Sequence, residues 1–319
     1  MRADPVWFPV GVTQQGVEWA QTSRNTLSEA PFLFPDVFSG AKKQVRPSEH
    51  TDGILPRYIF HTAFCCSTLF ARALDRAGKV LSLKEPEILM QLANFERNQP
   101  GKIGPALSSI TGGLFADDLE VRIVKPTNAA NRIISELMQF ESARAIIIHS
   151  DFESFVLSIA RKGEEGRTFV RRLYNILLMD SPFAQSLPQR DVFTLSDLQI
   201  AGFVWAIQCQ QVQDAVNRFP DRYRMVHCDD FLGKPSVTLA AVAEFLSLPL
   251  TSEDIDEAVA SDVFGTNSKF ADQSFDTNIR EAQKLEAQKA FAQSIEFVRN
   301  WVGKLPLPLE IRGRALLNA

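Results

Sequence analysis

Cysteine is scarce in this 319-residue chain, in which the four cysteines lie at positions 65, 66, 209 and 228. Two of them are adjacent, and an adjacent pair cannot provide the C-x-x-C ligand spacing of a zinc site. Four cysteines so placed also do not fit the disulfide framework of a small secreted domain. The sequence therefore predicts neither a metal site nor disulfides, and a reducing cytoplasm is the simplest location.

Long apolar runs and an excess of positive charge are also missing. No window approaches the roughly eighteen apolar residues that a membrane span needs. The N-terminal stretch is broken by Pro5 and Pro9 and lacks the apolar core of a signal peptide. The formal net charge of -4 argues against nucleic acid or an anionic membrane as the main partner. We expect a soluble globular protein in which any anion site is local.

From residue 57 onward, short apolar runs alternate with helical periodicity, as in Leu69, Phe70, Ala73 and Leu74. The apolar runs predict strands at 58–60, 80–83, 121–124, 145–149 and 223–228. Strands that alternate with helices imply right-handed crossovers and a parallel sheet covered on both faces. The expected fold class is therefore α/β, a three-layer αβα arrangement around a central parallel sheet.

The chain divides into an N-terminal arm and one main domain. Residues 1–56, rich in proline, glycine and charge, predict turns and short segments that belong to the main domain of 57–319 or pack on it. Within that domain, the turn residues of 92–118 predict an insertion or a lid. The weak periodicity of 261–280 predicts a loop, and 281–302 predict a helix.

Ligands of open parallel sheets collect beyond the carboxyl ends of the strands. The residues expected at those ends are His61 to Thr68, Lys84 to Pro86, Lys125 to Thr127, His149 to Asp151, and Cys228 to Asp230. This mixture of lysines and hydroxyls suits an anion. Ser67 and Thr68 would occupy the first turn of a helix, whose backbone N–H groups bind phosphate or sulfate. Alternatively, the two hydroxyls only cap the helix in a tight turn.

The turn at 61–68 is not a Walker A loop, because it contains no glycine and no lysine, which argues against ordinary ATP or GTP hydrolysis. A minor alternative interprets Cys66 to Arg72 as a Cys-x5-Arg phosphatase loop, in which a thiolate attacks phosphorus. Such a loop must curl around the phosphate, whereas Leu69 and Phe70 already begin an apolar helix face. Small cysteines that pack in the core are the other interpretation.

At this point the sequence resembles the sulfotransferase family, whose members transfer a sulfuryl group from 3'-phosphoadenosine 5'-phosphosulfate (PAPS) on a P-loop-like αβα fold. The stretch "CCSTLFARALD" (65–75) is similar to the family's 5'-phosphosulfate loop. "ARAIIIHSDFESFVLSIARKG" (143–163) is similar to the strand and helix that hold the 3'-phosphate. "YRMVHCDDFLGKPSVTLAAVAEFLSLPL" (223–250) resembles the family's strand, acidic turn and following helix.

The resemblance implies roles for individual residues. The spacing from Ser67 and Thr68 to Glu85 is like that of the tyrosylprotein-type branch, in which a glutamate is the catalytic base. Lys125 would neutralise charge on the phosphosulfate. The implied donor-binding residues are Ser67, Thr68, Cys66, Ser158, Ser150 and Lys84. The alternative for Glu85 is an ion pair with a lysine that only holds a loop.

The sequence departs from the family where cations are expected. Phe64 and the cysteine pair stand where the family has a lysine or arginine ahead of a Ser-Gly pair, and Ser150 stands where it has an arginine. The C-terminal G-x-x-G-x-x-K segment is not visible. Residues that could compensate are Lys84, Lys125, Arg161, Lys162, Lys269 and Arg280.

The resemblance therefore implies sulfuryl transfer from PAPS to a hydroxyl or amine of a small-molecule, carbohydrate or phenolic acceptor, without a metal. The missing cations leave open a catalytically inactive relative that binds a nucleotide or another partner.

Overall fold

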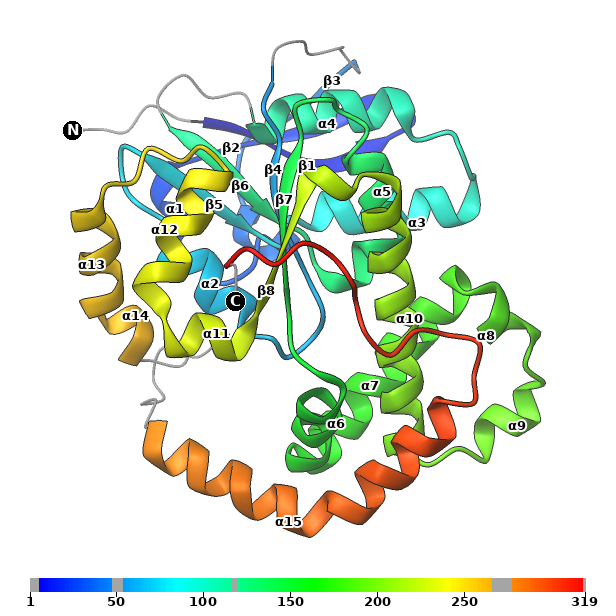
Figure 1. Ribbon diagram of the computed structural model, residues 1–319. Coiled ribbons are helices and arrows are strands. Elements are labelled where there is room, and N and C mark those ends of the chain that lie inside the picture. The colour runs from blue at the N-terminus through cyan, green and yellow to red at the C-terminus, as the bar shows by residue number, and fades with distance from the viewer. Residues whose placement is uncertain (1–5, 48–53, 116–119, 266–276, 318–319) are drawn as a thin grey trace.

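The computed structural model describes residues 6–47, 54–115, 120–265 and 277–317. Its centre is a five-stranded parallel sheet with the strand order β5-β6-β4-β7-β8 (Figure 1). The strands are β4 (Arg57–His61), β5 (Val80–Lys84), β6 (Val121–Lys125), β7 (Arg144–His149) and β8 (Tyr223–His227). Each agrees with a predicted strand to within one residue at either end, and the α/β prediction is confirmed.

Successive residues of the strands point to opposite faces of the sheet, and both faces are buried. On one face, Ile59, Ile123 and Ile146 pack with buried residues of four helices. These helices are α2 (Ser67–Ala73), α11 (Cys228–Gly233), α12 (Pro235–Phe245) and α13 (Ser252–Ala260). Apolar residues at nearly every strand position therefore form a core against this helical layer.

On the opposite face, Tyr58, Phe60 and Ile147 belong to a second core. The helices that contribute to it are α3 (Glu87–Asn98), α4 (Gly104–Phe115), α5 (Ile134–Leu137) and the C-terminal half of α10 (Asp197–Arg218). Helices thus cover both faces, which confirms the three-layer αβα arrangement.

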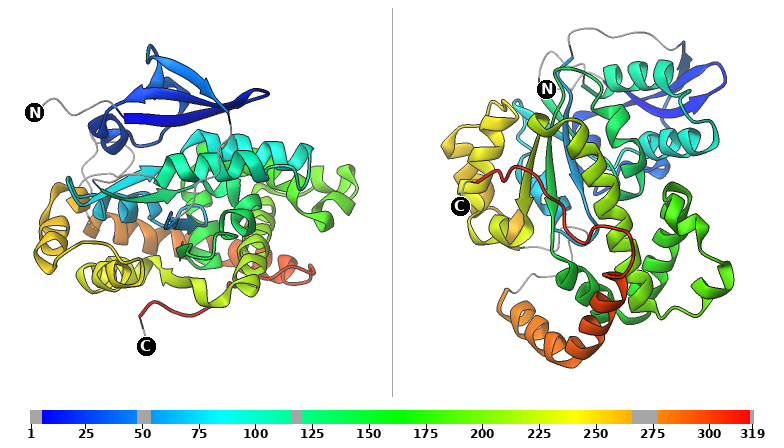
Figure 2. Two further views of the ribbon diagram at one scale, coloured as in Figure 1. Left: turned by 90° about the horizontal axis from the view of Figure 1, so that it is seen from above. Right: turned by 45° about the vertical axis from the view of Figure 1, so that its right-hand side comes forward.

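The N-terminal arm is a sheet, and the prediction of turns and short segments was wrong. An antiparallel sheet is formed by β1 (Val6–Thr13), β2 (Gly16–Thr22) and β3 (Lys43–Arg46). Helix α1 (Arg24–Glu29) lies between β2 and β3 in the chain. Figure 2 shows this sheet lying over α3 and α4. Pro9 does not break β1, because the register shifts between Pro9 and Gly11, and such irregularities accommodate a residue without an N–H.

The segment 92–118 is helical up to Phe115, as the end of α3 and all of α4, whereas turn residues predicted an irregular insertion. Ile110 and Leu114 of α4 are fully buried between the two sheets. Pro100 and Gly101 separate the two helices, whereas Gly104 and Pro105 begin α4 and two further glycines lie within it. Residues 116–119 lie outside the described residues, and the role of the segment as a lid stays a prediction.

A third core lies beyond the carboxyl ends of the strands, where β7 leads into α6 (Figure 1). Its helices are α6 (Phe152–Arg161), α7 (Gly163–Leu177), α8 (Pro182–Ser186), α9 (Gln189–Phe193), the first half of α10, and α15 (Thr277–Val302). The predicted helix at 281–302 is confirmed. Of the predicted loop at 261–280, α14 (Asp262–Gly265) and the start of α15 are helical, and 266–276 lie outside the described residues.

Among the helices that the structure describes, none combines the length and the hydropathy needed to cross a bilayer.

Candidate active site

Three polar side chains meet at the carboxyl ends of neighbouring strands β4, β6 and β5. Lys125 Nζ donates to Glu85 Oε1 at 2.5 Å and lies 3.3 Å from His61 Nε2. His61 Nε2 lies 4.0 Å from the same Glu85 oxygen. We call these residues the strand-end triad. The Lys125 side chain is completely buried, whereas 14% of the Glu85 side chain is exposed, so the triad reaches solvent through Glu85.

The backbone at Glu85 holds an unusual conformation. Its φ of 50° lies in the left-handed region, which residues other than glycine seldom occupy. The Glu85 N–H donates to the Lys125 carbonyl at 2.6 Å, so both backbone and side chain of Glu85 bind Lys125. Strained conformations of this kind persist only where their surroundings fix them, and they are concentrated at functional sites.

His61 is neutral in this environment. Burial, together with the neighbouring Lys125 ammonium, lowers the pKa of His61 to about 3. Its Nδ1 lies 2.9 Å from the Thr62 carbonyl, and its Nε2 lies 3.0 Å from the Pro126 carbonyl. Two carbonyl neighbours favour an imidazolium, but burial and Lys125 outweigh them. Nε2 also lies 3.3 Å from Lys125 Nζ, and it accepts from this ammonium in the tautomer that carries its proton on Nδ1.

Gln208 of α10 joins the loops that follow β4 and β6. Its Oε1 accepts the Ala63 N–H at 3.0 Å and the Asn128 side-chain amide, also at 3.0 Å. Asn131, in the same turn as Asn128, donates to the His61 carbonyl at 3.2 Å. Gln208 is completely buried. A single amide oxygen therefore fixes the backbone of the loop at 62–66 relative to the turn after Lys125.

Ser67 and Thr68 begin α2 at the same edge of the sheet, as the sequence predicts, and both are buried. Cys66 is the N-cap residue with a φ of 59°. Burial raises the pKa of Cys65 to about 12. The hydroxyl and the N–H of Ser67 bond to the Cys65 sulfur, and these bonds oppose the rise in pKa. The bonding capacity of Ser67 is therefore partly directed at Cys65, and its role in donor binding stays a prediction.

Two hydroxyls at the ends of β4 and β7 have no hydrogen-bond partner among the described residues. These are Thr62 Oγ1 and Ser150 Oγ, on residues that are 0% and 1% exposed. Such orphaned buried hydroxyls are costly and indicate a missing partner. Ser158 differs, because its hydroxyl donates to the Ser154 carbonyl within α6 at 2.7 Å.

The side chain of Lys84, the last residue of β5, binds α1 and not the triad residues: its Nζ donates to the Ser28 carbonyl. Burial lowers the pKa of Lys84 to about 8, although the nearby Asp75 carboxylate opposes this shift. Because its Nζ is held by α1, Lys84 is a weaker candidate than Lys125 for the cation at the donor site.

Two of the remaining cations that could compensate for the missing ones lie at the end of α6. Lys162 Nζ pairs with Glu165 at 2.8 Å, and Arg161 is exposed in the last turn of α6. Lys269 lies outside the described residues. Arg280 belongs to α15, in a part whose side chains are not described.

The phosphatase alternative is contradicted by α2. The chain enters the helix immediately after Cys66, and Arg72 lies in the last turn of that helix. At 1.5 Å per residue, the two backbones are separated by about 9 Å along the helix. Residues 67–73 therefore do not curl around an anion, because their apolar side chains pack α2 against the sheet.

Roles for His61 and Gln208 were not predicted from the sequence. His61 stood among the strand-end residues without a role of its own. Gln208 is a polar residue within the apolar face of Phe203, Val204 and Ile207, and that interruption was the signal that could have identified it.

One group in the described part of the chain could hold a metal ion, although the sequence predicted no such cluster. Ligand atoms of His227, Cys228 and Asp229 lie within 4.8 Å of one another. His227 Nδ1 accepts the Asp229 N–H at 3.3 Å, so the imidazole is the N-cap of α11. That cap competes with metal binding through the same nitrogen.

Comparison with known proteins gives similarity to solved structures alone, since no family model and no curated protein matches the chain. The sulfotransferase domain from the curacin biosynthetic pathway is 17% identical over 82% of this chain and 95% of its own, with a TM-score of 0.44. The sulfotransferase domain of the Synechococcus PCC 7002 olefin synthase is 13% identical over 82% of this chain and 100% of its own, with a TM-score of 0.44. Retinol dehydratase, solved with androsterone and the inactive cofactor PAP, is 12% identical over 93% of this chain and 90% of its own, with a TM-score of 0.37.

Two of these structures are named as sulfotransferase domains, the family that the sequence resembles. With TM-scores below 0.5, their similarity carries no argument about the site.

Proposed function

We propose that this protein transfers a sulfuryl group from PAPS to a hydroxyl group of a small-molecule acceptor. The observation that supports this proposal is the strand-end triad, in which a partly exposed carboxylate is fixed by a buried lysine at the ligand-binding edge of the sheet. A fixed base and a fixed cation are what an in-line transfer requires.

In the proposed reaction, the donor supplies an electrophilic sulfur: a new bond forms between sulfur and the acceptor oxygen, the bond to the phosphate oxygen breaks, and adenosine 3',5'-bisphosphate leaves. Glu85 takes the proton of the acceptor hydroxyl. Lys125 orients that carboxylate and offsets negative charge near it. Neutral His61 accepts a hydrogen bond from Lys125 without adding a competing positive charge.

The residues around the triad fit a donor that carries anionic oxygens. Thr62 and Ser150 present buried hydroxyls without a partner in the described structure, and hydroxyls donate readily to phosphate or sulfate oxygens. Ser67, Thr68 and Cys66 lie at the neighbouring turn, and Ser158 lies on α6. We assign Lys125 the main charge on the donor and Lys84 a lesser share.

A second candidate is a nucleotide-binding protein without transfer activity. The observation in its favour is that residues 62–71 contain neither lysine nor arginine, so the loop after β4 contributes no cation.

Calorimetric titration with adenosine 3',5'-bisphosphate, with ADP as the control ligand, tests the proposed donor site. We expect selective binding of the bisphosphate, and about tenfold weaker binding by Lys125→Met, because this variant removes a buried positive charge at the ligand-binding edge of the sheet. Equal binding of both nucleotides, or none, would contradict the proposed donor. Binding without transfer to any acceptor would favour the second candidate.

A further inference from the structure

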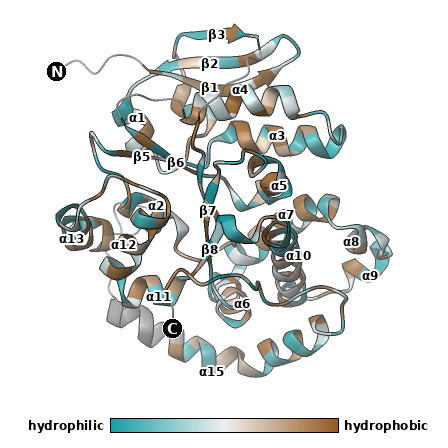
Figure 3. Cartoon of the chain, turned by 45° about the horizontal axis from the view of Figure 1, so that its top comes forward, coloured by the Kyte–Doolittle hydropathy of each residue, from teal (hydrophilic) through white to brown (hydrophobic). Residues whose placement is uncertain are grey.

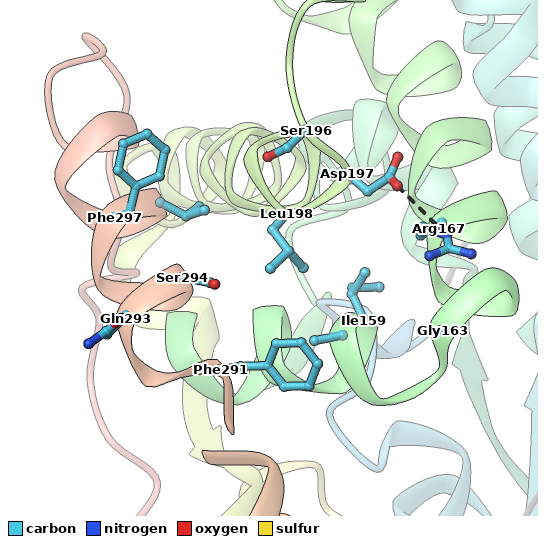
Figure 4. A pocket seen from close by; sticks show the side chains of 12 residues that line it. Ile159, Gly163, Arg167, Ser196, Asp197, Leu198, Phe291, Gln293, Ser294 and Phe297 are labelled. Atoms are coloured by element: carbon cyan, nitrogen blue, oxygen red, sulfur yellow. Dashed lines mark ion pairs between the residues drawn. The ribbon is translucent and has the colours of Figure 1, made fainter. Parts of the chain in front are cut away.

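A cavity of about 700 Å³ lies between α6, α7, α10 and α15 (Figure 4). Its walls are largely apolar, with Ile159 of α6, Leu198 of α10, and Phe291 and Phe297 of α15. Cavities of this size commonly hold small molecules that are largely removed from water. The coloured part of α15 in Figure 3 carries both hydrophobic and hydrophilic residues, so that it both faces this cavity and meets solvent.

One end of the cavity is charged. Arg167 lines it and faces Asp197, with Nε at 3.7 Å from the carboxylate (Figure 4). Arg171 binds the same carboxylate more closely, at 2.6 Å. Two guanidinium groups thus share one carboxylate, which leaves an excess positive charge there. Arg167 holds the weaker contact, and 56% of its side chain is exposed. This end of the cavity is therefore suited to an anionic group.

The cavity is separate from the strand-end triad. Phe155, one turn before Ile159 on α6, contacts Phe64 of the loop after β4, with ring centroids 6.2 Å apart. None of the residues that line the cavity belongs to the triad or to that loop. A ligand in the cavity would not occupy the donor site, and its binding can be measured independently of any transfer activity.

We propose that this cavity binds a single-chain amphiphile with an anionic head, namely a long-chain carboxylate. The aliphatic chain would lie between Leu198, Ile159 and Phe291, where its burial removes apolar surface from water. The carboxylate would lie beside Arg167, which can replace its long contact with Asp197 by a closer one.

Calorimetric titration with dodecanoate tests the proposal, and dodecyltrimethylammonium provides the same chain with the opposite charge. We expect one dodecanoate per chain, and binding of the cation at least tenfold weaker. Arg167→Gln should weaken dodecanoate binding about fivefold, because a half-exposed contact contributes less than a buried one. The control Arg190→Gln, at a side chain that is 87% exposed on α9 and outside the cavity, should leave it unchanged.

A cavity-filling variant tests the location. Ser294 of α15 lines the cavity and points into it (Figure 4), and its side chain is exposed, so that Ser294→Trp should abolish dodecanoate binding. Ala292→Trp, an exposed position of the same helix outside the lining, should not. If a tryptophan variant fails to fold, the comparison of dodecanoate with dodecyltrimethylammonium binding to the unmodified protein still tests the proposal.

Three results would overturn the proposal. They are absence of dodecanoate binding, equal binding of both amphiphiles, and full binding by Ser294→Trp. Sedimentation that shows a dimer dissociated by Ser294→Trp, with no dodecanoate bound, would instead identify a second copy of the chain as the occupant and would also overturn it.

Discussion

Glu85 binds Lys125 twice, through its backbone N–H to the Lys125 carbonyl at 2.6 Å and through its carboxylate to Nζ at 2.5 Å. Lys125 ends β6, and Glu85 directly follows Lys84, which ends the adjacent strand β5 and is the register partner of Lys125. Glu85 is the first residue beyond β5, and its φ of 50° turns its side chain toward the buried ammonium of Lys125. The same contact therefore positions the proposed base and neutralises a lysine that is 0% exposed.

A double-mutant cycle should show that this pair is strongly coupled. Glu85→Gln leaves a buried ammonium without its carboxylate and should lower the free energy of unfolding by about 3 kcal/mol. Lys125→Met should cost less, because Glu85 retains access to solvent. The double variant should be at least about 1 kcal/mol more stable than the sum of the single changes predicts. Urea denaturation measures all four proteins, and additive costs would contradict the coupling.

Neutral His61 should make stability depend on pH. Its pKa of about 3 in the folded state lies below the ordinary value of 6.5, so the unfolded chain binds one more proton between these pH values. Stability should therefore fall as the pH decreases from about 6.5, by up to about 1.4 kcal/mol per pH unit. His61→Gln should remove this part of the slope, whereas His227→Gln should retain it. Denaturation at several pH values between 4 and 7 provides the comparison, and identical slopes for His61→Gln and the unmodified protein would show that His61 is not the titrating group.

Gln208 should be required for the arrangement of the loop after β4. Gln208→Leu removes the acceptor of the Ala63 N–H and the Asn128 amide, two buried donors. We expect a loss of about 2 to 4 kcal/mol in the free energy of unfolding, together with weaker binding of adenosine 3',5'-bisphosphate. The control Gln210→Leu, which loses only a contact with Asp214 on the helix surface, should cost less than about 0.5 kcal/mol. Equal costs in the two variants would argue against a positioning role for Gln208.

The two strand-end lysines should differ in their effect on donor binding. Lys125→Met should weaken binding of adenosine 3',5'-bisphosphate about tenfold, and Lys84→Met less than about threefold, because Lys84 Nζ is held by the Ser28 carbonyl. Calorimetry on both variants, after their folding has been checked by circular dichroism, measures the difference. A larger loss with Lys84→Met would assign the main cation to Lys84.

The sheet could be predicted from the sequence because each strand is a short apolar run and each intervening helix has its own period. The same reasoning placed Glu85 and Lys125 at strand ends. It could not establish which lysine Glu85 meets, because that depends on the pairing of β5 with β6 across residues distant in the chain.

The parts that the sequence did not predict depend on tertiary contacts. Gln208 reaches Ala63 across 145 residues of sequence, and no local pattern encodes that contact. The N-terminal sheet was missed because the proline, glycine and charge of residues 1–56 predicted turns, whereas a shift in register accommodates Pro9 within β1.

Transfer of labelled sulfuryl from PAPS to a panel of phenolic, alcoholic and carbohydrate acceptors measures the proposed reaction itself. We expect a labelled product with the unmodified protein, and at least about a hundredfold less with Glu85→Gln under conditions where the variant is folded and binds adenosine 3',5'-bisphosphate normally. Undiminished transfer by Glu85→Gln would contradict Glu85 as the base, and absence of any labelled product with the unmodified protein would contradict the proposed activity.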